Sequence, residues 1–388
     1  MTDAIVVGGG MVGAAAALAL AHAGMDVVLV EAREPRPWHP EDEVDLRVVA
    51  LAPSSAALLD ELGLWQTIRT TRAHAYTRMH VWDAESGAAL DFDSADVQGD
   101  SLGWIVENRL LQHQLWQKAQ VAGVRCLCPA KVSAFENADD HVHVSLEDGT
   151  GLDAKVLIAA DGATSPLRKL AGIATRGHAY EQRAVVAHVA TERSHEDTAW
   201  QRFLPGGPIA LLPLADGRSS VVWTLPEADA QHVLSMDDSA FCEALGVASD
   251  FRLGRVIAPT PRAAFPLKLQ LASDYRAGRL VLLGDAAHVV HPLAGQGVNL
   301  GLRDVAELRD VLRSAHDAGR DVGTDHVLQR YARRRRSADT LDGRAFDALQ
   351  RMFIWRAPAM ASVRSLGMTT MDRFGPMKKW LMQHAAGI

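Results

Sequence analysis

A glycine-rich turn between a strand and a helix, at the start of the chain, constrains the fold more than any other feature. The apolar run 4–7 predicts a buried strand, Gly8 to Gly13 supplies the pattern G-x-G-x-x-G, and the Ala-rich segment 14–23 predicts a helix. A second apolar strand, Val27–Val30, ends at Glu31. This strand, helix, strand and acid within about 30 residues are typical of a Rossmann-like dinucleotide-binding unit.

Each residue of this unit has a physical task. Gly8 permits the tight turn, Gly10 lets the backbone approach a pyrophosphate, and Gly13 lets the helix pack closely on the sheet. Met11 and Val12 open the helix, whose N–H groups and dipole favour phosphate charge, and Glu31 is placed to accept hydrogen bonds from a ribose. The pattern does not separate NAD from FAD, although its N-terminal position favours a tightly held FAD.

A second glycine-rich stretch follows the apolar strand 279–283. Asp285 comes at the strand end, and a turn through Pro292 and Gly295 to Gly297 then opens another helix. Such a turn brings backbone N–H groups up to a polar or anionic ligand.

The composition is typical of a globular protein and excludes several other classes. With 388 residues, 48% hydrophobic and 22% charged, the chain is expected to form a globular core of two domains or one large interrupted one. Three cysteines indicate a reducing compartment, and the net charge of −7 argues against general nucleic-acid binding. We see no signal peptide and no apolar run long enough to cross a bilayer, so we expect a cytoplasmic protein.

The order of predicted helices and strands along the chain indicates a discontinuous α/β fold. Segments 1–70, 100–175 and 275–335 read as a Rossmann-like domain. Segments 71–99 and 176–274 read as a mainly antiparallel substrate domain, because short alternating strands are separated by Gly and Pro turns. Segment 336–388 reads as a helical C-terminal region.

Three motifs in series resemble those of the class A flavoprotein aromatic monooxygenases, and most closely the ubiquinone-biosynthesis hydroxylase branch. They are Gly8–Gly13 with Glu31, Asp161-Gly162, and Gly284-Asp285 with its continuation to Asp304. The resemblance spans nearly the whole chain. It implies a para-hydroxybenzoate-hydroxylase-like FAD-binding domain, FAD as cofactor, and NADH or NADPH with O₂ as co-substrates.

The resemblance also implies roles for individual residues. Asp285 would bind the ribityl hydroxyls of FAD, with a helix N-cap as the alternative, and Asp161-Gly162 would contact FAD and NAD(P)H, with a strand-terminating turn as the alternative. Arg47 and Arg109 would reach FAD, unless they are surface ion-pair partners. The segment along the flavin ring would comprise Pro292, Gly295, Gln296, Gly297, Val298 and Asn299.

The implied chemistry comes from the flavin. NAD(P)H reduces FAD, O₂ forms a C4a-hydroperoxide, and the ring of a polyprenylated phenol takes the distal oxygen. Phe203, Leu211 and Trp223 are suggested as lining the substrate side. No general base is identified. The histidine pairs His141/His143 and His288/His291 complete no metal-ligand set, and we expect the second pair to belong to the flavin loop. A hydroxylase of another soluble aromatic compound and a non-catalytic flavin-binding assembly subunit remain as alternatives.

The C-terminal section is basic. From residue 301 onward there are 16 Lys and Arg against 10 Asp and Glu, a net of +6. Arg333–Arg336 predicts a solvated helix face. Lys378–Met382 resembles an interfacial anchor suited to the inner membrane face, where the substrate and other ubiquinone-biosynthesis proteins are found. The alternative is a helix packed on the domain or on a partner subunit of a homo-oligomer.

Overall fold

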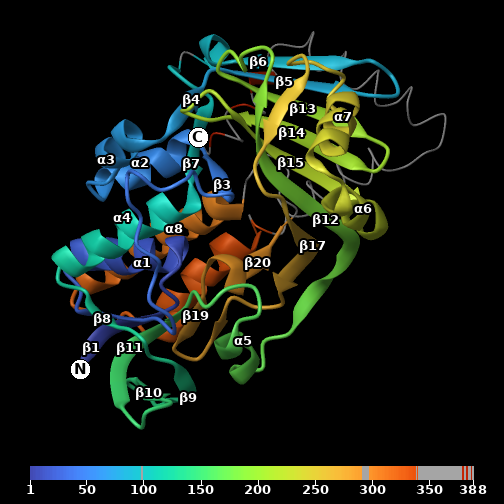
Figure 1. Ribbon diagram of the computed structural model, residues 1–388. Coiled ribbons are helices and arrows are strands. Elements are labelled where there is room, and N and C mark those ends of the chain that lie inside the picture. Colours follow the sequence, from blue (N-terminus) through green and yellow to red (C-terminus); the bar gives the residue numbers. More distant parts are fainter. Residues whose placement is uncertain are drawn as a thin grey trace.

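The computed structural model describes residues 1–97, 99–290 and 297–337, together with the single positions 339, 378, 379, 382 and 386. Within these residues the strands form three sheets, and helices cover them (Figure 1). No helix in the described ranges is long and apolar enough to cross a membrane.

The first sheet carries the N-terminal unit. Its central strands are parallel, in the order β19-β11-β1-β2-β8. The predicted strand, helix and strand are confirmed as β1 (Thr2–Val7), α1 (Met11–His22) and β2 (Val27–Val30). The other strands of this sheet are β8 (Arg125–Leu127), β9 (Val132–Asn137), β10 (Val142–Leu146), β11 (Gly151–Ala159), β18 (Arg276–Ala277) and β19 (Leu280–Leu282).

Helices α1, α4 (Asn108–Val121) and α8 (Gly297–His316) pack together against this sheet. Their apolar faces and the sheet make the largest core, in which the alanines of α1 are almost fully buried. Small side chains let α1 lie close to its neighbours, and burial of this face stabilises the unit. Residues 325–337 are also helical.

The second sheet is mainly antiparallel, as predicted, and β13 with β5 is the one parallel pair among its described strands. Its longest strand, β12, runs beside β17. The strands are β5 (Arg78–Asp83), β6 (Ala89–Asp93), β12 (Thr175–Thr191), β13 (Thr198–Leu204), β14 (Gly207–Pro213), β15 (Ser219–Pro226), β16 (Val256–Pro259), β17 (Ala263–Ala272) and β20 (His288–Val289).

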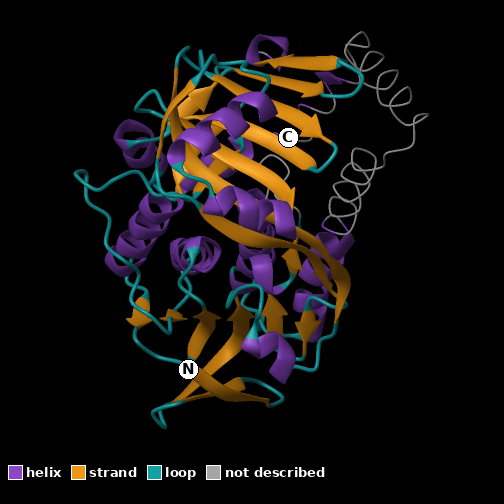
Figure 2. Ribbon diagram, turned by 45° about the vertical axis from the view of Figure 1, so that its right-hand side comes forward, coloured by secondary structure: helices purple, strands orange, loops and turns teal. Residues whose placement is uncertain are grey.

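Two helices that the sequence did not predict, α6 (Glu227–Ser235) and α7 (Asp238–Ala248), cover the outer face of this sheet (Figure 2). Asp237 caps α7 through a hydrogen bond from the Ala240 N–H (2.8 Å). The inner face of the sheet is left for the cavity described below.

A small third sheet connects the two others. It consists of β3 (Val48–Leu51), β7 (Gly103–Glu107) and β4 (His74–Tyr76), in the order β3-β7-β4. The remaining short elements are α2 (Pro53–Glu61), α3 (Trp65–Thr71), α5 (Pro166–Leu170), and the 3₁₀ turns η1 (Ser94–Val97) and η2 (Gly284–Ala286).

The topology brings the three sequence motifs to one edge. Strands β1, β11 and β19 are adjacent and parallel, so their carboxyl ends, followed by Gly8, Asp161 and Gly284, meet at the same edge of the first sheet. The division of the chain into domains stays a prediction.

Candidate active site

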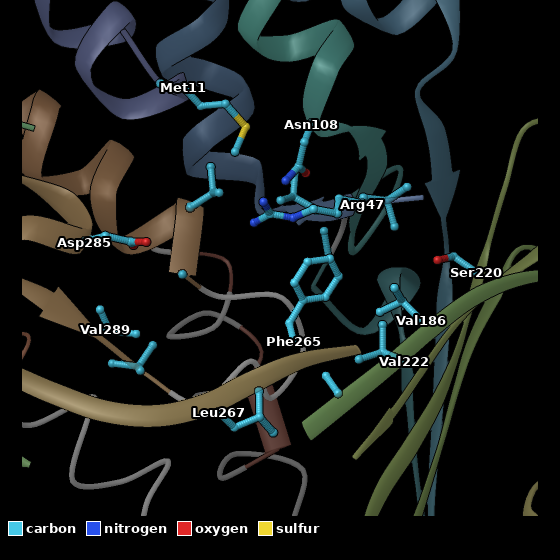
Figure 3. Close-up of a pocket in the computed structure, with 18 of the residues that line it drawn as sticks. Met11, Arg47, Asn108, Val186, Ser220, Val222, Phe265, Leu267, Asp285 and Val289 are labelled. Atoms are coloured by element: carbon cyan, nitrogen blue, oxygen red, sulfur yellow. The ribbon is translucent and has the colours of Figure 1, made fainter. Parts of the chain in front are cut away.

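A cavity of about 470 Å³ lies between this edge and the inner face of the second sheet (Figure 3). One wall is the start of α1, with Gly10 to Gly13, together with Gly162 and Asp285. The opposite wall comes from β12, β14, β15 and β17, which present mostly aliphatic side chains. A single cavity therefore joins the glycine-rich turns to an apolar surface.

The turn before α1 has the shape expected for a phosphate cradle. Gly8 has φ +108°, and a Cβ there would lie 2.2 Å from the Ala160 carbonyl oxygen. A Cβ on Gly13 would lie 1.9 Å from the Gly8 carbonyl oxygen, whereas one on Gly10 would meet no protein atom within 4 Å. Gly8 and Gly13 are therefore required by close packing, while Gly10 leaves free space beside the helix start.

The N-terminus of α1 is open. Gly10 offers no side-chain cap, and the first turn has no acidic residue, so the first N–H groups and the positive end of the dipole are available to an anion. Glu31 lies beside the turn and accepts hydrogen bonds from the N–H of Gly9 (2.5 Å) and of Arg33 (2.9 Å). Gln112 on α4 donates to the Gly9 carbonyl (3.0 Å) and holds the turn from the other side.

Asp285 points into the cavity (Figure 3). Its side chain is open to water there and makes no hydrogen bond within the described ranges, so the N-cap alternative is not what the geometry shows. The surrounding protein raises the pKa of this carboxyl by desolvation, and nearby His288, Arg47 and Lys268 oppose that rise. It is a polar group held ready for a ligand.

Asp161 is used inside the protein. It accepts hydrogen bonds from the Ser165 hydroxyl (2.5 Å) and from the Leu167 N–H (3.0 Å), and so it holds the start of α5. This geometry matches the structural alternative for its carboxylate. Gly162, with φ +81°, lines the cavity.

The two arginines differ. Arg47 lies in the cavity, with its guanidinium over the Phe265 ring at 5.2 Å (Figure 3). Arg109 instead pairs with Asp42 (3.2 Å) and donates to the Glu43 carbonyl (3.4 Å). Arg109 therefore has the ion-pair geometry that was its alternative reading.

The start of α8 contributes Gly297 and Val298 to the cavity. Asn299 is fully buried, and its side chain accepts hydrogen bonds from the Ala52 N–H (2.9 Å) and the Ser55 hydroxyl (2.7 Å). Its amide thus fastens α8 to the end of β3. Pro292, Gly295 and Gln296 lie outside the described residues.

The predicted substrate wall was wrong. Leu211 and Trp223 pack in the core beneath α6 and α7, and Phe203 packs with Val81 and Leu90. Because side chains alternate along a strand, the neighbours of Leu211 and Trp223 line the cavity instead, and these are Ala210, Leu212, Val222 and Thr224. On β13 the cavity is lined by Gln201, which lies two residues before Phe203 on the same face of the strand. Large residues fill the core, and an open cavity is bounded by smaller ones.

Sequence reasoning also missed a buried ionic cluster behind the Gly284 turn. Asp304 on α8 accepts hydrogen bonds from the Gly284 N–H (2.9 Å) and from His288 Nε2 (2.7 Å), and it pairs with Arg335 (2.5 Å). Arg335 also contacts Asp339. His288 is therefore not a flavin-loop side chain, and Arg335, 8% exposed, is not on a solvated face.

Charge coupling shifts the pKa values in this cluster. Burial alone would lower the pKa of His288, but Asp304 and Asp339 raise it to about 9. Burial raises the pKa of Asp339 to about 7, with Asp304 acting in the same direction. The charged His288–Asp304 pair holds the turn that carries Asp285.

Among the residues that the structure describes, two groups of histidine and aspartate side chains are close enough to share a metal ion, which the sequence pattern did not predict. The first is His74, His195 and Asp197, where His74 Nε2 lies 2.9 Å from Asp197 Oδ1. The second is His288, Asp304 and Asp339, whose carboxylates are already paired with Arg335.

The described part of the C-terminal segment contacts the protein. Lys378 pairs with Asp96 (3.4 Å) and lies over the Phe92 ring at 6.0 Å, and Met382 is 6% exposed. These side chains fit the packed-helix alternative better than an interfacial anchor.

Comparison with known proteins identifies the family of this chain. A family model described as an FAD binding domain matches residues 1–341. The chain is 37% identical to 3-demethoxyubiquinol 3-hydroxylase of Escherichia coli, covering 100% of this chain and 99% of the relative. It is 35% identical to the human ubiquinone biosynthesis monooxygenase COQ6, covering 99% and 92%.

Among solved structures, p-nitrophenol 4-monooxygenase PnpA from Pseudomonas putida DLL-E4 superposes with a TM-score of 0.79 at 21% identity, covering 99% of this chain and 97% of that one. This likeness supports the predicted fold class. The chain belongs to the FAD-dependent monooxygenase family that includes the hydroxylases of ubiquinone biosynthesis.

Proposed function

We propose that this protein uses FAD, NADH or NADPH, and O₂ to hydroxylate the aromatic ring of a polyprenylated phenol in ubiquinone biosynthesis. The observation that carries the proposal is the single cavity that joins the open start of α1 and Asp285 to the aliphatic wall of the second sheet. When bound, FAD supplies the reductive activation of O₂.

The residues at one end of the cavity fit FAD. The N–H groups of Met11, Val12 and Gly13 would bind the pyrophosphate, because the helix start is uncapped and Gly10 leaves room beside it. Glu31 would bind the adenosine ribose and Asp285 the ribityl hydroxyls. The start of α8 at Gly297 and Val298 would face the ring, together with Pro292, Gly295 and Gln296.

Arg47 would meet the flavin or a phosphate, since its guanidinium already lies in the cavity. For Asp161 and Arg109 the existing hydrogen bonds and ion pairs point to an indirect part: they would hold the backbone around the cofactor. Gly162 remains a direct backbone contact, because it lines the cavity.

The other end of the cavity fits an apolar aromatic ring. Val186, Leu212, Val222 and Leu267 would pack on its faces and keep water from the reacting atoms. Phe265 and Arg47 lie between this wall and Asp285 (Figure 3), so they mark where ring and cofactor would meet.

The test uses purified protein loaded with FAD, a prenylated phenol, NADPH or NADH, and isotopically labelled O₂. We expect phenol-stimulated nicotinamide oxidation and one labelled oxygen in the ring product. A strain that lacks the protein should accumulate a prenylated phenol. Flavin binding without substrate-stimulated oxidation would favour a non-catalytic subunit, and turnover confined to small soluble phenols would favour the other hydroxylase reading.

We also propose that the basic C-terminal section docks on an anionic membrane surface while the lipophilic substrate is drawn in. Lys378 and Met382 would not form the anchor, since they contact the protein. Flotation of the holoprotein with vesicles containing anionic lipid tests this. We expect binding that weakens with salt, and its absence at low salt would remove the proposal.

A further inference from the structure

Two polar atoms at the sheet wall have no hydrogen-bond partner among the described residues: Ser220 Oγ and His188 Nδ1. Both residues are 1% exposed. They are directly paired across β12 and β15, so their side chains share the inner face of the sheet. Ser220 lines the cavity, and Figure 3 shows it on the wall opposite Asp285.

The hydrogen bonds of His188 fix its tautomer. Its Nε2 lies 3.0 Å from the Asp45 carbonyl oxygen, which can only accept, so Nε2 carries the hydrogen. Nδ1 then carries a lone pair, and no described residue donates a hydrogen bond to it. The backbone N–H of His188 donates to the Thr260 hydroxyl (2.9 Å), and this bond fixes the backbone of His188.

The surroundings keep this imidazole neutral. Burial lowers the pKa of His188, and Arg218 acts in the same direction, while the Asp45 carbonyl and the Asp216 carboxylate oppose them. Asp216 and Arg218 are paired with each other at 2.6 Å in the turn between β14 and β15. A neutral imidazole with a free Nδ1 is a proton acceptor.

An unpaired buried hydroxyl is not distinctive by itself, because Ser219 Oγ also lacks a partner among the described residues. The difference is the face. Ser219 pairs with Val189 and so lies on the outer face, where Val189 belongs to the core beneath α6 and α7, whereas Ser220 and His188 lie on the cavity face. A buried polar group without a partner is destabilising, because it has lost its hydrogen bonds to water. A ligand hydroxyl would satisfy both atoms of the inner pair at once.

We propose that Ser220 and His188 receive the hydroxyl group of the phenol substrate and that His188 takes up its proton. This inference rests on the proposed function. The phenol O–H bond breaks and an N–H bond forms at Nδ1, while the Ser220 hydroxyl donates a hydrogen bond to the phenol oxygen. The phenolate charge spreads into the ring and makes its carbon more nucleophilic towards the oxygen donor.

The proton then returns. When the newly oxygenated ring carbon loses its hydrogen as a proton to water, the imidazolium gives the proton it holds back to the original phenol oxygen. His188 is neutral again, and the product leaves as a phenol. This pair would supply the general base that the sequence did not reveal.

The test follows the ionisation of a bound phenol in the FAD-loaded protein. The probe is a prenylated 2-nitrophenol, whose phenolate absorbs at longer wavelength than its neutral form. The variants are His188→Gln, whose amide can still donate to the Asp45 carbonyl, and Ser220→Ala. Ser219→Ala is the matched control, because it removes the same atom from the opposite face of the same strand.

We expect the wild-type protein to ionise the probe at a lower pH than free solution does, and both variants to lose this shift. His188→Gln should lower kcat/KM for the phenol by about 10²- to 10⁴-fold, the range for a general base. It should also remove the fall of kcat/KM at acid pH that titration of the histidine produces. Ser219→Ala should behave like wild type, and FAD content should be the same in all four proteins.

Wild-type ionisation and rates in both variants would overturn the inference. Failure of the proposed function looks different: the wild-type holoprotein would ionise the bound probe yet incorporate no oxygen into any prenylated phenol. If His188→Gln does not fold, Ser220→Ala carries the same comparison, since it leaves the Asp45 contact intact.

Discussion

Raising the pH from 7 to 9 should destabilise this protein through one buried histidine. His288 is 1% exposed, and its Nε2 lies 2.7 Å from Asp304 Oδ2. Its pKa in the folded protein is about 9, above the ordinary value of 6.5. A raised folded pKa gives stability that is fully present below pH 6.5 and is lost as the pH rises through 9. At about 1.4 kcal/mol per pKa unit, the full loss in the free energy of unfolding is about 3 kcal/mol.

The neighbouring Asp339 titrates in a lower window. Its folded pKa is raised from 3.8 to about 7, so its contribution is present below pH 3.8 and is lost as the pH rises through 7. The range above pH 7 therefore reports mainly on His288.

The assay is urea unfolding at pH 7 and pH 9, followed by fluorescence and circular dichroism together. His288→Gln should be less stable at pH 7, because Asp304 loses one of its two charged partners, and should lose less stability than wild type on going to pH 9. His143→Gln is the control, since its pair with Asp153 (2.7 Å) is partly exposed and is worth about 0–1 kcal/mol. Equal losses in wild type and His288→Gln would refute the reasoning.

Three further predictions concern the cavity. Asp285→Asn should weaken FAD binding by about 10- to 100-fold, the value of a charge-assisted hydrogen bond, without lowering the melting temperature of the FAD-free protein. A flavin fluorescence titration checks the affinity, thermal unfolding followed by circular dichroism checks the stability, and unchanged affinity would exclude Asp285 as a contact. Gly10→Ala should fold normally, because its Cβ meets no protein atom, but should lose FAD, because the Cβ occupies the space left for the pyrophosphate. Gly13→Ala should misfold, because its Cβ would lie 1.9 Å from the Gly8 carbonyl oxygen. Circular dichroism and flavin content separate the two outcomes. Val222→Phe should block binding of the phenol with little loss of folding stability. Trp223→Ala should lower the free energy of unfolding by about 3–5 kcal/mol, because Trp223 packs in the core beneath α6 and α7. The opposite pattern would mean that the cavity wall is assigned to the wrong face of the sheet.

The local parts of the fold were predictable. The strand, glycine turn and helix at Thr2–His22 follow from hydrophobic periodicity and from the restricted space at Gly8 and Gly13. The convergence of Asp161 and Asp285 at one edge follows from the rule that parallel strands end together. Helices α6 and α7 were missed because both are short, with 9 and 11 residues, and the surrounding strands dominate the pattern.

Long-range pairing was not predictable. Nothing local distinguishes Arg335 from its exposed neighbours, and only the fold brings it to Asp304, 31 residues earlier. The face of a strand is a similar case. Trp223 lies on the core face and Val222 on the cavity face, because the covering helices α6 and α7 decide which face of the strand is core. His188 and Ser220 became a candidate pair only when β12 and β15 were seen side by side.

In the proposed function the cavity holds FAD at one end and a lipophilic phenol at the other. Mass spectrometry of the product that FAD-loaded protein forms from a prenylated phenol, NAD(P)H and labelled O₂ tests this arrangement. We expect one labelled oxygen on the ring, and none with Val222→Phe. A holoprotein that oxidises NAD(P)H but returns the phenol unlabelled would contradict it.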